Sequence, residues 1–298
     1  MLSSASCVVA DILLNTGRCT KKMNDNKTKV AAIQMATSPN VSANLLEAER
    51  LITEAAESGA GLVVLPENFA FMGEHERQMC TLREREGDGP LQHFISQMAK
   101  RLGIWLVGGT IPLEASDGAK VRAASLVFDD QGRTVARYDK IHLFDVQLVE
   151  NDERYEESNT IEPGEQTLVV DTPFGRLGIA VCYDLRFPEL FRKLLSQGAE
   201  IFAVPAAFTA ITGKAHWESL VRARAIENLA FVVAAAQGGY HLNGRETHGH
   251  SMIVDPWGTI LAQVPRGTGF VSVELDRDYQ QTIRRTFPTI EHQRLTVY

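Results

Sequence analysis

From Lys29 to the C-terminus, short apolar runs alternate with segments of helical periodicity, and this alternation restricts the possible folds more than any other feature. The run Leu62–Leu65 is apolar at every position, as expected of a strand that is covered on both faces. Between Asn44 and Glu57, apolar residues recur at the spacing of one helical face, and Gly59 follows. Strands and helices that alternate in this way predict an α/β protein.

The same patterns predict elements along the whole of this region. We expect helices at residues 44–57, 91–102, 188–197, 216–228 and 277–286. We expect strands at residues 30–35, 62–65, 104–108, 125–128, 134–138, 167–171, 175–182, 201–204, 231–236, 251–254, 260–264 and 270–274. No linker or low-complexity tract interrupts the pattern, so residues 29–298 are predicted to form one domain.

Two distant segments resemble each other. Residues 59–69 are GAGLVVLPENF and residues 198–208 are GAEIFAVPAAF. Each combines a helix end, a buried strand, a proline and a phenylalanine in the same order. The similarity suggests two related β-α-β halves, with a chance match as the alternative. In either case both segments end a buried strand, and binding sites in α/β sheets form outside the carboxyl ends of such strands.

Composition excludes some classes of partner. The formal net charge is −7, which disfavours nucleic acid and anionic membranes because both need clustered Lys and Arg. No apolar run approaches the roughly 20 residues that span a bilayer. The cysteines Cys7, Cys19, Cys80 and Cys182 form no C-x-x-C pair, so a reducing, cytoplasmic compartment is the simpler interpretation.

The first 28 residues differ from the rest of the chain. Their apolar segment from Cys7 to Leu14 is interrupted by Asp11, and the basic residues follow it, which is a poor match to a signal peptide. We interpret residues 1–28 as a leader that is expected to be disordered, with organelle targeting as the alternative.

Cys182 is the first candidate for chemistry. It follows the apolar residues 177–181 and precedes the polar run YDLRFPE, so a thiol is expected at a strand-to-helix turn. At such a turn the backbone N–H of Tyr183 can face a developing oxyanion. Most lone cysteines are small buried apolar residues, but a purely structural strand seldom ends in so many charged residues.

Two charged residues also follow strands. Glu67 comes directly after Leu62–Leu65 and Pro66, where partial desolvation would raise the pKa of a carboxyl group towards the range of a general base. Lys140 follows the strand expected at 134–138, where a buried ammonium could stabilise a thiolate or an oxyanion. Taken alone, each is more often an ordinary loop or edge residue.

Together, the three segments resemble the signatures of the nitrilase superfamily. LPE ends at Glu67, YDKIHLF contains Lys140, and VCYDLRFPE contains Cys182, in the family's order. The resemblance implies a four-layer α-β-β-α sandwich, a glutamate general base, a lysine and a cysteine nucleophile. It also implies a second glutamate at the site, which falls most plausibly on Glu157, although Glu156 is adjacent.

Further segments resemble the amidase branch that acts on deaminated glutathione. These are residues 205–218, 222–228, 249–252 and 254–258. The resemblance implies cleavage of an amide into 2-oxoglutarate and cysteinylglycine, and the neighbouring alternative is an ω-amidase acting on α-ketoglutaramate. We expect Phe208 and Thr209 to contact substrate, with Lys214 as a hypothetical partner for a substrate carboxylate.

The implied mechanism passes through a thioester. Glu67 removes the thiol proton, Cys182 attacks the amide carbonyl, and Lys140 with the Tyr183 N–H holds the oxyanion. Glu157 is expected to position Lys140 or substrate. The chemistry calls for no metal and no organic cofactor. By the same resemblance, we expect a homodimer or a larger even homo-oligomer, with residues 287–298 docking on a partner subunit.

Two other functions remain open at the level of sequence. A Cys–His hydrolase would pair Cys182 with His142, His216 or His250, oriented by Asp184. A non-catalytic binding module on the same fold is the other possibility, although such a protein would usually lose one of the three reactive residues. His248 and His250 lack an obvious third metal ligand, so we interpret them as structural.

Overall fold

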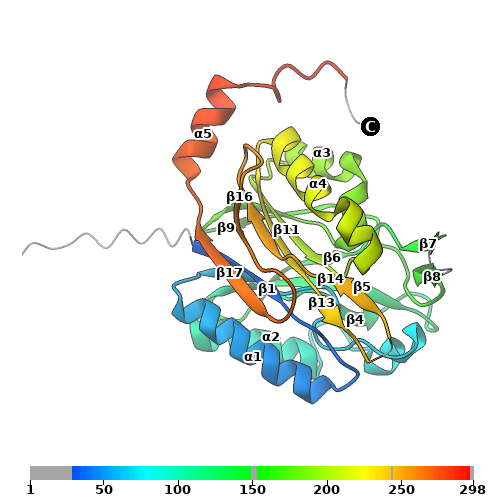
Figure 1. Cartoon of the computed structure of the whole chain (residues 1–298). Helices are drawn as coiled ribbons and strands as arrows, with labels where there is room; N and C mark the ends of the chain where they lie inside the picture. Colours follow the sequence, from blue (N-terminus) through cyan, green and yellow to red (C-terminus); the bar gives the residue numbers. More distant parts are fainter. Residues whose placement is uncertain (1–28, 149–152, 243, 296–298) are drawn as a thin grey trace, which may run out of the picture.

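The computed structural model describes residues 29–148, 153–242 and 244–295. The leader predicted at residues 1–28 lies outside this part of the chain. Two large sheets stack face to face, with helices on the outer side of each (Figure 1). Helices α1 (Val41–Glu57) and α2 (Pro90–Leu102) cover one sheet, and α3 (Pro188–Ser196) and α4 (Ala210–Asn228) cover the other. The predicted four-layer α-β-β-α sandwich is confirmed.

The first sheet has seven strands in the order β17-β1-β2-β3-β5-β4, with β6 paired to β5. The second has six strands in the order β16-β15-β12-β11-β10-β9. The strands of the first sheet are β1 (Lys29–Gln34), β2 (Leu62–Val64), β3 (Trp105–Val107), β4 (Ile111–Glu114), β5 (Val121–Phe128), β6 (Thr134–Asp139) and β17 (Gly269–Glu274). Those of the second are β9 (Leu168–Thr172), β10 (Gly175–Ile179), β11 (Ile201–Ala206), β12 (Phe231–Ala236), β15 (Met252–Val254) and β16 (Ile260–Gln263).

Each large sheet contains one β-α-β-α-β half. Strands β1, β2 and β3 are parallel and are joined through α1 and α2. Strands β10, β11 and β12 are parallel and are joined through α3 and α4. Each of the two similar sequence segments therefore contains the second strand of its half, β2 or β11, and the residues just after it. Both strands present their carboxyl ends to one region of the molecule, where the site described below lies.

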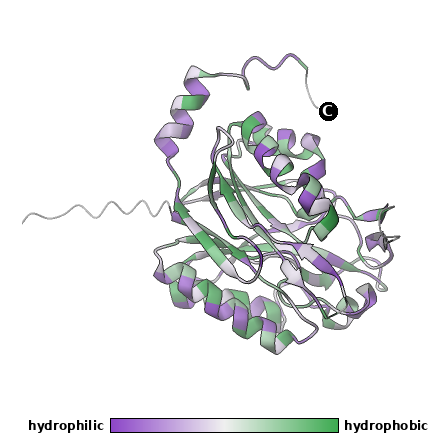
Figure 2. Ribbon diagram, in the orientation of Figure 1, coloured by the Kyte–Doolittle hydropathy of each residue, from purple (hydrophilic) through white to green (hydrophobic). Residues whose placement is uncertain are grey.

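The central strands are buried on both faces, which explains their continuous apolar runs. In β1, Val30 and Ala32 pack into the core between the two sheets, while Ala31 and Ile33 pack beneath α1 and α2. In α1 and α2 the buried residues are mainly apolar, and Figure 2 shows hydrophobic and hydrophilic residues alternating along these helices. Burial of this apolar area is the main favourable contribution to the free energy of folding.

Two short hairpins were not predicted. Strands β7 (Asp145–Leu148) and β8 (Glu153–Glu156) form one, and β13 (Gly238–Tyr240) and β14 (Glu246–His248) form the other. The short strand β4 was also missed. These strands have three or four residues each, too few for a period-2 pattern to stand out.

Helix α4 begins six residues before the expected start at residue 216. The Thr209 side chain caps it, accepting a hydrogen bond from the Thr212 N–H at 3.3 Å. Helix α5 (Arg277–Thr286) has the predicted bounds. Three 3₁₀ helices complete the described elements: η1 (Glu76–Leu82), η2 (Glu157–Asn159) and η3 (Cys182–Arg186). Within the residues described, no helix is long and apolar enough to cross a membrane.

Candidate active site

Glu67 lies just beyond the carboxyl end of β2 and is 4% exposed. The backbone before it passes close to Gly109, which has a positive φ of 57°. A Cβ atom at Gly109 would lie 2.1 Å from the Pro66 carbonyl oxygen, so only glycine fits there. This close packing explains the glycine at position 109 and holds the segment that carries Glu67.

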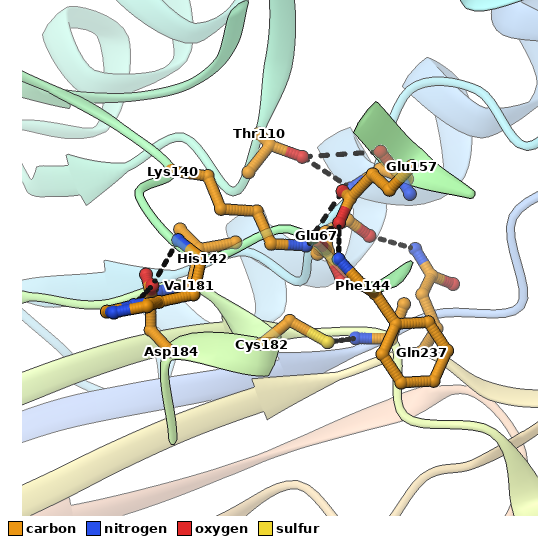
Figure 3. A network of polar contacts seen from close by, with 12 residues as sticks. Glu67, Thr110, Lys140, His142, Phe144, Glu157, Val181, Cys182, Asp184 and Gln237 are labelled. Atoms are coloured by element: carbon orange, nitrogen blue, oxygen red, sulfur yellow. Dashed lines mark hydrogen bonds and ion pairs between the residues drawn. The ribbon is translucent and has the colours of Figure 1, made fainter. Parts of the chain in front are cut away.

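Lys140 follows β6 directly and is 2% exposed. Its ammonium nitrogen Nζ lies 2.8 Å from Oε1 of Glu67 and 2.8 and 2.9 Å from Oε1 and Oε2 of Glu157 (Figure 3). Glu157, at the start of η2, also accepts a hydrogen bond from the Phe144 N–H at 2.6 Å. The second glutamate therefore falls on Glu157, because Glu156 instead pairs with Arg154.

Cys182 begins η3 at the end of the segment that continues from β10, and its φ of 48° is in the left-handed region. This conformation is unusual for a residue with a side chain, and such residues cluster at functional sites. The sulfur Sγ accepts a hydrogen bond from the Ala207 N–H at 3.4 Å. Ala207 follows β11, the parallel neighbour of β10, so the ends of two adjacent strands of the second half meet at the thiol.

The charges and the burial of this cluster shift the pKa values of the thiol and the ammonium. Burial raises the pKa of the Cys182 thiol well above its usual range, and the Glu67 carboxylate raises it further, against the opposing effects of Lys140 and the Ala207 N–H. Burial would lower the pKa of Lys140, but the carboxylates of Glu157 and Glu67 outweigh it and hold that pKa well above normal. The resting cluster therefore contains a neutral thiol and an ammonium, so a base must deprotonate the thiol.

Asp184 is fully buried and organises the turn that carries Cys182. It accepts hydrogen bonds from the Tyr138 hydroxyl at 2.6 Å, the Val181 N–H at 2.8 Å, and the N–H and Nδ1 of His142 at 3.0 and 2.7 Å. Tyr138 and His142 flank Lys140 in the chain. Asp184 thus joins the lysine segment to the cysteine turn.

Gln237, which follows β12, makes the corresponding connection to Glu67. Its side-chain amide donates to the Glu67 carbonyl at 2.9 Å and to the Thr37 hydroxyl at 2.7 Å, and its Oε1 accepts from the Thr37 N–H at 3.0 Å. Its own backbone N–H donates to the Ala206 carbonyl at 2.9 Å. Gln237 therefore connects the segment holding Glu67 to the strand end beside Ala207, whose N–H contacts the thiol.

These groups open into a pocket of about 90 Å³. Half of the residues that line it are apolar or aromatic and half are polar or charged, a combination that suits a small polar ligand. They are Glu67, Asn68, Met79, Ala123, Lys140, Phe144, Tyr155, Glu157, Thr160, Ile161, Cys182, Tyr183, Arg186, Ala207, Phe208, Thr209, Thr212 and Arg245.

Most of the predicted site residues meet here, but Lys214 does not. Glu67, Lys140, Glu157, Cys182, Tyr183, Phe208 and Thr209 all line the pocket. Lys214 is exposed on α4, because the cap at Thr209 starts the helix early and its turn directs this side chain to solvent. The expectation of Lys214 as a carboxylate partner is therefore not supported.

Several pocket residues were missed from the sequence, Arg186 and Arg245 among them. Arg186 lies over the rings of Phe208 and Tyr183, with its guanidinium carbon 5.1 and 5.7 Å from their centroids. It forms no ion pair with the residues that the structure describes. Thr212 and Arg245 also face the cavity. The signal for Arg186 was present in the sequence, since it belongs to the polar run after Cys182.

None of the three histidines proposed for a Cys–His pair lines the pocket. His142 is held by Asp184 and stacks on Phe187 with ring centroids 3.7 Å apart. His250 stacks on His248 at 4.4 Å. Within residues 29–148, 153–242 and 244–295, no group of three or more His, Cys, Asp or Glu side chains is placed to hold a metal ion.

Comparison with known proteins agrees with this geometry. The chain matches the family model described as carbon-nitrogen hydrolase over residues 29–285. It is 46% identical to deaminated glutathione amidase of Yersinia enterocolitica, over 89% of this chain and 92% of that protein. It is 43% identical to the protein of the same name from Synechocystis, over 88% and 96% of the two chains. The crystal structure of Saccharomyces cerevisiae Nit3, a member of branch 10 of the nitrilase superfamily, superposes with a TM-score of 0.80 at 32% identity and covers 90% of this chain and 96% of that chain. The chain belongs to the carbon-nitrogen hydrolase family, within the nitrilase superfamily, and is an amidase that hydrolyses carbon–nitrogen bonds.

Proposed function

We propose that this amidase hydrolyses deaminated glutathione to 2-oxoglutarate and cysteinylglycine. The observation that supports it best is the buried cluster in which Lys140 bridges two glutamates beside the Cys182 thiol. Relatives 43–46% identical over most of their length carry the name deaminated glutathione amidase. The pocket supplies a cation for a dicarboxylate, since Arg186 faces it without an ion pair among the described residues.

In the first half of the reaction, the Glu67 carboxylate accepts the thiol proton as Sγ of Cys182 attacks the amide carbonyl carbon. The carbonyl oxygen becomes an oxyanion, which Lys140 and the Tyr183 N–H stabilise. The C–N bond then breaks, and protonated Glu67 gives its proton to the departing amine. The products of this half are a free amine and a thioester on Cys182.

In the second half, Glu67 removes a proton from water, and the resulting hydroxide adds to the thioester carbonyl. The C–S bond breaks, releasing the carboxylic acid, and protonated Glu67 returns its proton to the Cys182 thiolate. Glu157 has a different role in this proposal: its two contacts to Lys140 hold the ammonium towards the reacting carbonyl. Arg186 binds the carboxylate of the 2-oxoglutarate part, with Phe208, Thr209 and Thr212 around it.

We propose the domain organisation, the cellular location and the assembly of the protein on the same basis. Residues 29–298 form one domain, preceded by a leader. The protein is cytoplasmic, which fits the free thiols of Cys80 and Cys182. It assembles as a homodimer or larger even homo-oligomer through its C-terminal tail, residues 287–298.

Release of 2-oxoglutarate from deaminated glutathione tests the proposal, with α-ketoglutaramate as a parallel substrate. We expect a higher kcat/KM for deaminated glutathione and no turnover by Cys182→Ala. Cys80→Ala is the matched control, since Cys80 lies outside the cavity, and it should retain full activity. A preference for α-ketoglutaramate would instead identify an ω-amidase, and turnover by Cys182→Ala would contradict the mechanism.

A further inference from the structure

The catalytic pocket opens into a second, much larger cleft. The cleft has a volume of about 930 Å³, whereas the pocket that holds Cys182 has about 90 Å³. Five residues line both: Asn68, Met79, Tyr155, Thr160 and Arg245. Only the outer cleft reaches the size of roughly 300–1,000 Å³ that is usual for ligand pockets. The inner pocket therefore holds one part of a substrate, and the rest extends into the cleft.

The chemistry of the reaction decides which part lies where. The scissile carbonyl must sit at Sγ of Cys182, which lines the inner pocket and not the cleft. Arg186, the cation placed to bind the acyl group, also lines only the inner pocket. The amine that leaves must therefore point through the shared opening into the cleft.

The charged residues that line the cleft are mostly basic. Arg77 on η1, Arg154 on β8 and Arg245 between β13 and β14 face it, with His75, although Arg154 also pairs with Glu156. Among the residues that the structure describes, Glu74 is the one acidic residue in the lining. Arg77 is exposed and makes no ion pair with a side chain that the structure describes. An excess of arginine in a concave site favours an anionic ligand, and guanidinium matches the geometry of a carboxylate.

Arg245 occupies the opening between the two cavities. Its side chain donates to the Ala207 carbonyl at 3.2 Å, and its guanidinium carbon lies 5.1 Å from the centroid of the Tyr155 ring. Tyr155 belongs to the hairpin β7–β8, so two hairpins on either side of the opening meet through this contact. The Ala207 carbonyl belongs to the residue whose N–H contacts the thiol, which keeps the guanidinium close to the scissile bond.

We propose that this cleft is the binding site for the leaving amine and selects amines that carry a carboxylate, namely short peptides with a free C-terminus. Arg245 binds the leaving group at the opening, and Arg77 attracts its terminal carboxylate farther out. The inference rests on the proposed function and deepens it. It assigns the two ends of the substrate to two cavities, with an arginine in each.

Three amides that share the 2-oxoglutarate acyl group test the proposal: deaminated glutathione, the same compound with its C-terminal carboxylate converted to carboxamide, and α-ketoglutaramate. We expect kcat/KM to fall about tenfold on loss of the carboxylate, mainly through KM, as for the loss of one charge-assisted hydrogen bond. In Arg245→Gln and Arg77→Gln, the ratio of kcat/KM between the first two compounds should fall towards one. Arg285→Gln, an exposed arginine on α5 outside the cleft, is the matched control and should keep the wild-type ratio.

The outcomes separate this proposal from the proposed function. If the wild-type protein hydrolyses the carboxylate and the carboxamide equally well, the leaving-group site is wrong and the amidase function stands. If it hydrolyses none of the three compounds while iodoacetamide still alkylates Cys182, the proposed substrate is wrong. The ligand proposed for the cleft is then wrong as well. The comparison of the carboxylate and the carboxamide compounds in the wild-type protein tests the leaving-group site even if an arginine variant fails to fold. Calorimetry measures the Kd of the first two compounds for Cys182→Ala, and we expect the ratio of the two Kd values to show the same preference without turnover.

Discussion

At the scale of single residues, two opposite charges shift the pKa of the reactive thiol. Burial and the Glu67 carboxylate raise the pKa of Cys182, while the Lys140 ammonium lowers it. Keeping the thiol protonated at rest protects it from adventitious oxidation, because the thiolate is the reactive species. The general base then becomes essential to the first step, since it must remove the proton as the substrate is attacked.

This balance predicts opposite shifts for two substitutions. Glu67→Gln removes a negative charge beside the thiol, so the pKa of Cys182 should fall although amidase activity is lost. Lys140→Met removes the nearby cation, so the pKa should rise. The thiolate absorbance followed against pH measures both, with Cys182→Ala as the background to subtract. Shifts in the same direction for the two variants would contradict the electrostatic account.

His248 gives a separate prediction about stability and pH. Burial, with smaller effects of His250 and Arg266, lowers its pKa to about 4. The unfolded state takes up a proton near pH 6.5 and the folded state only near pH 4, so stability is lost as pH falls between these values. His248→Gln should therefore lose less stability between pH 7 and pH 4, by the order of 1–3 kcal/mol.

Urea unfolding at the two pH values measures the His248 effect. The matched control is His93→Gln, an exposed histidine on α2, which should lose as much stability as the wild-type protein over this range. An equal loss in the His248→Gln variant and in the wild-type protein would show that this side chain is not responsible.

At the scale of elements, the site is assembled from the ends of strands in both sheets. Glu67 follows β2 and Lys140 follows β6 in one sheet, while Cys182 follows β10 and Ala207 follows β11 in the other. Two buried side chains connect these ends: Asp184 joins the lysine and cysteine segments, and Gln237 joins the glutamate segment to β12. Neither contacts the pocket directly, so both act by positioning.

Gln237→Leu should lower kcat by about ten- to a hundredfold, because it releases the Glu67 backbone and a misplaced base costs about that much. The pH dependence of Cys182 alkylation should change as well, since Glu67 sets the pKa of the thiol. Gln280→Leu is the matched control. Gln280 is also a buried amide, on α5, and it bonds the carbonyls of Glu200 and Leu229 far from the thiol.

Both amide variants should lose stability, since each leaves buried polar groups without a partner. Only Gln237→Leu should change kcat and the alkylation profile. If the two variants lose stability equally and neither changes kcat of the folded protein, Gln237 has a purely structural role.

At the scale of the whole molecule, the C-terminal region carries exposed aromatic surface. Phe287 packs edge to face against Trp257 with ring centroids 5.3 Å apart, and both are about half exposed. Exposed aromatic pairs are typical of association surfaces. The pair lies where α5 ends and the proposed docking tail begins.

Deletion of residues 287–298 should therefore lower the mass of the assembly measured by analytical ultracentrifugation, and Phe287→Ser should act in the same direction. Val135→Ser, which alters an apolar residue of comparable exposure on β6, is the control and should leave the mass unchanged. An unaltered assembly after the deletion would show that the tail does not hold the subunits together.

Local sequence determined much of this protein. Continuous apolar runs between amphipathic helices predicted an α/β fold, because both signals arise within a single element, and the family resemblance supplied the layers. Glu67, Lys140 and Cys182 could be predicted as candidates because each directly follows a strand, in a segment that resembles a family signature. The tertiary structure decided the rest. It placed Glu157 rather than Glu156 on Lys140, brought Arg186 and Arg245 to the cavities, and directed Lys214 to solvent. Those outcomes depend on register, helix caps and the packing of segments far apart in the chain, and no local pattern encodes such contacts.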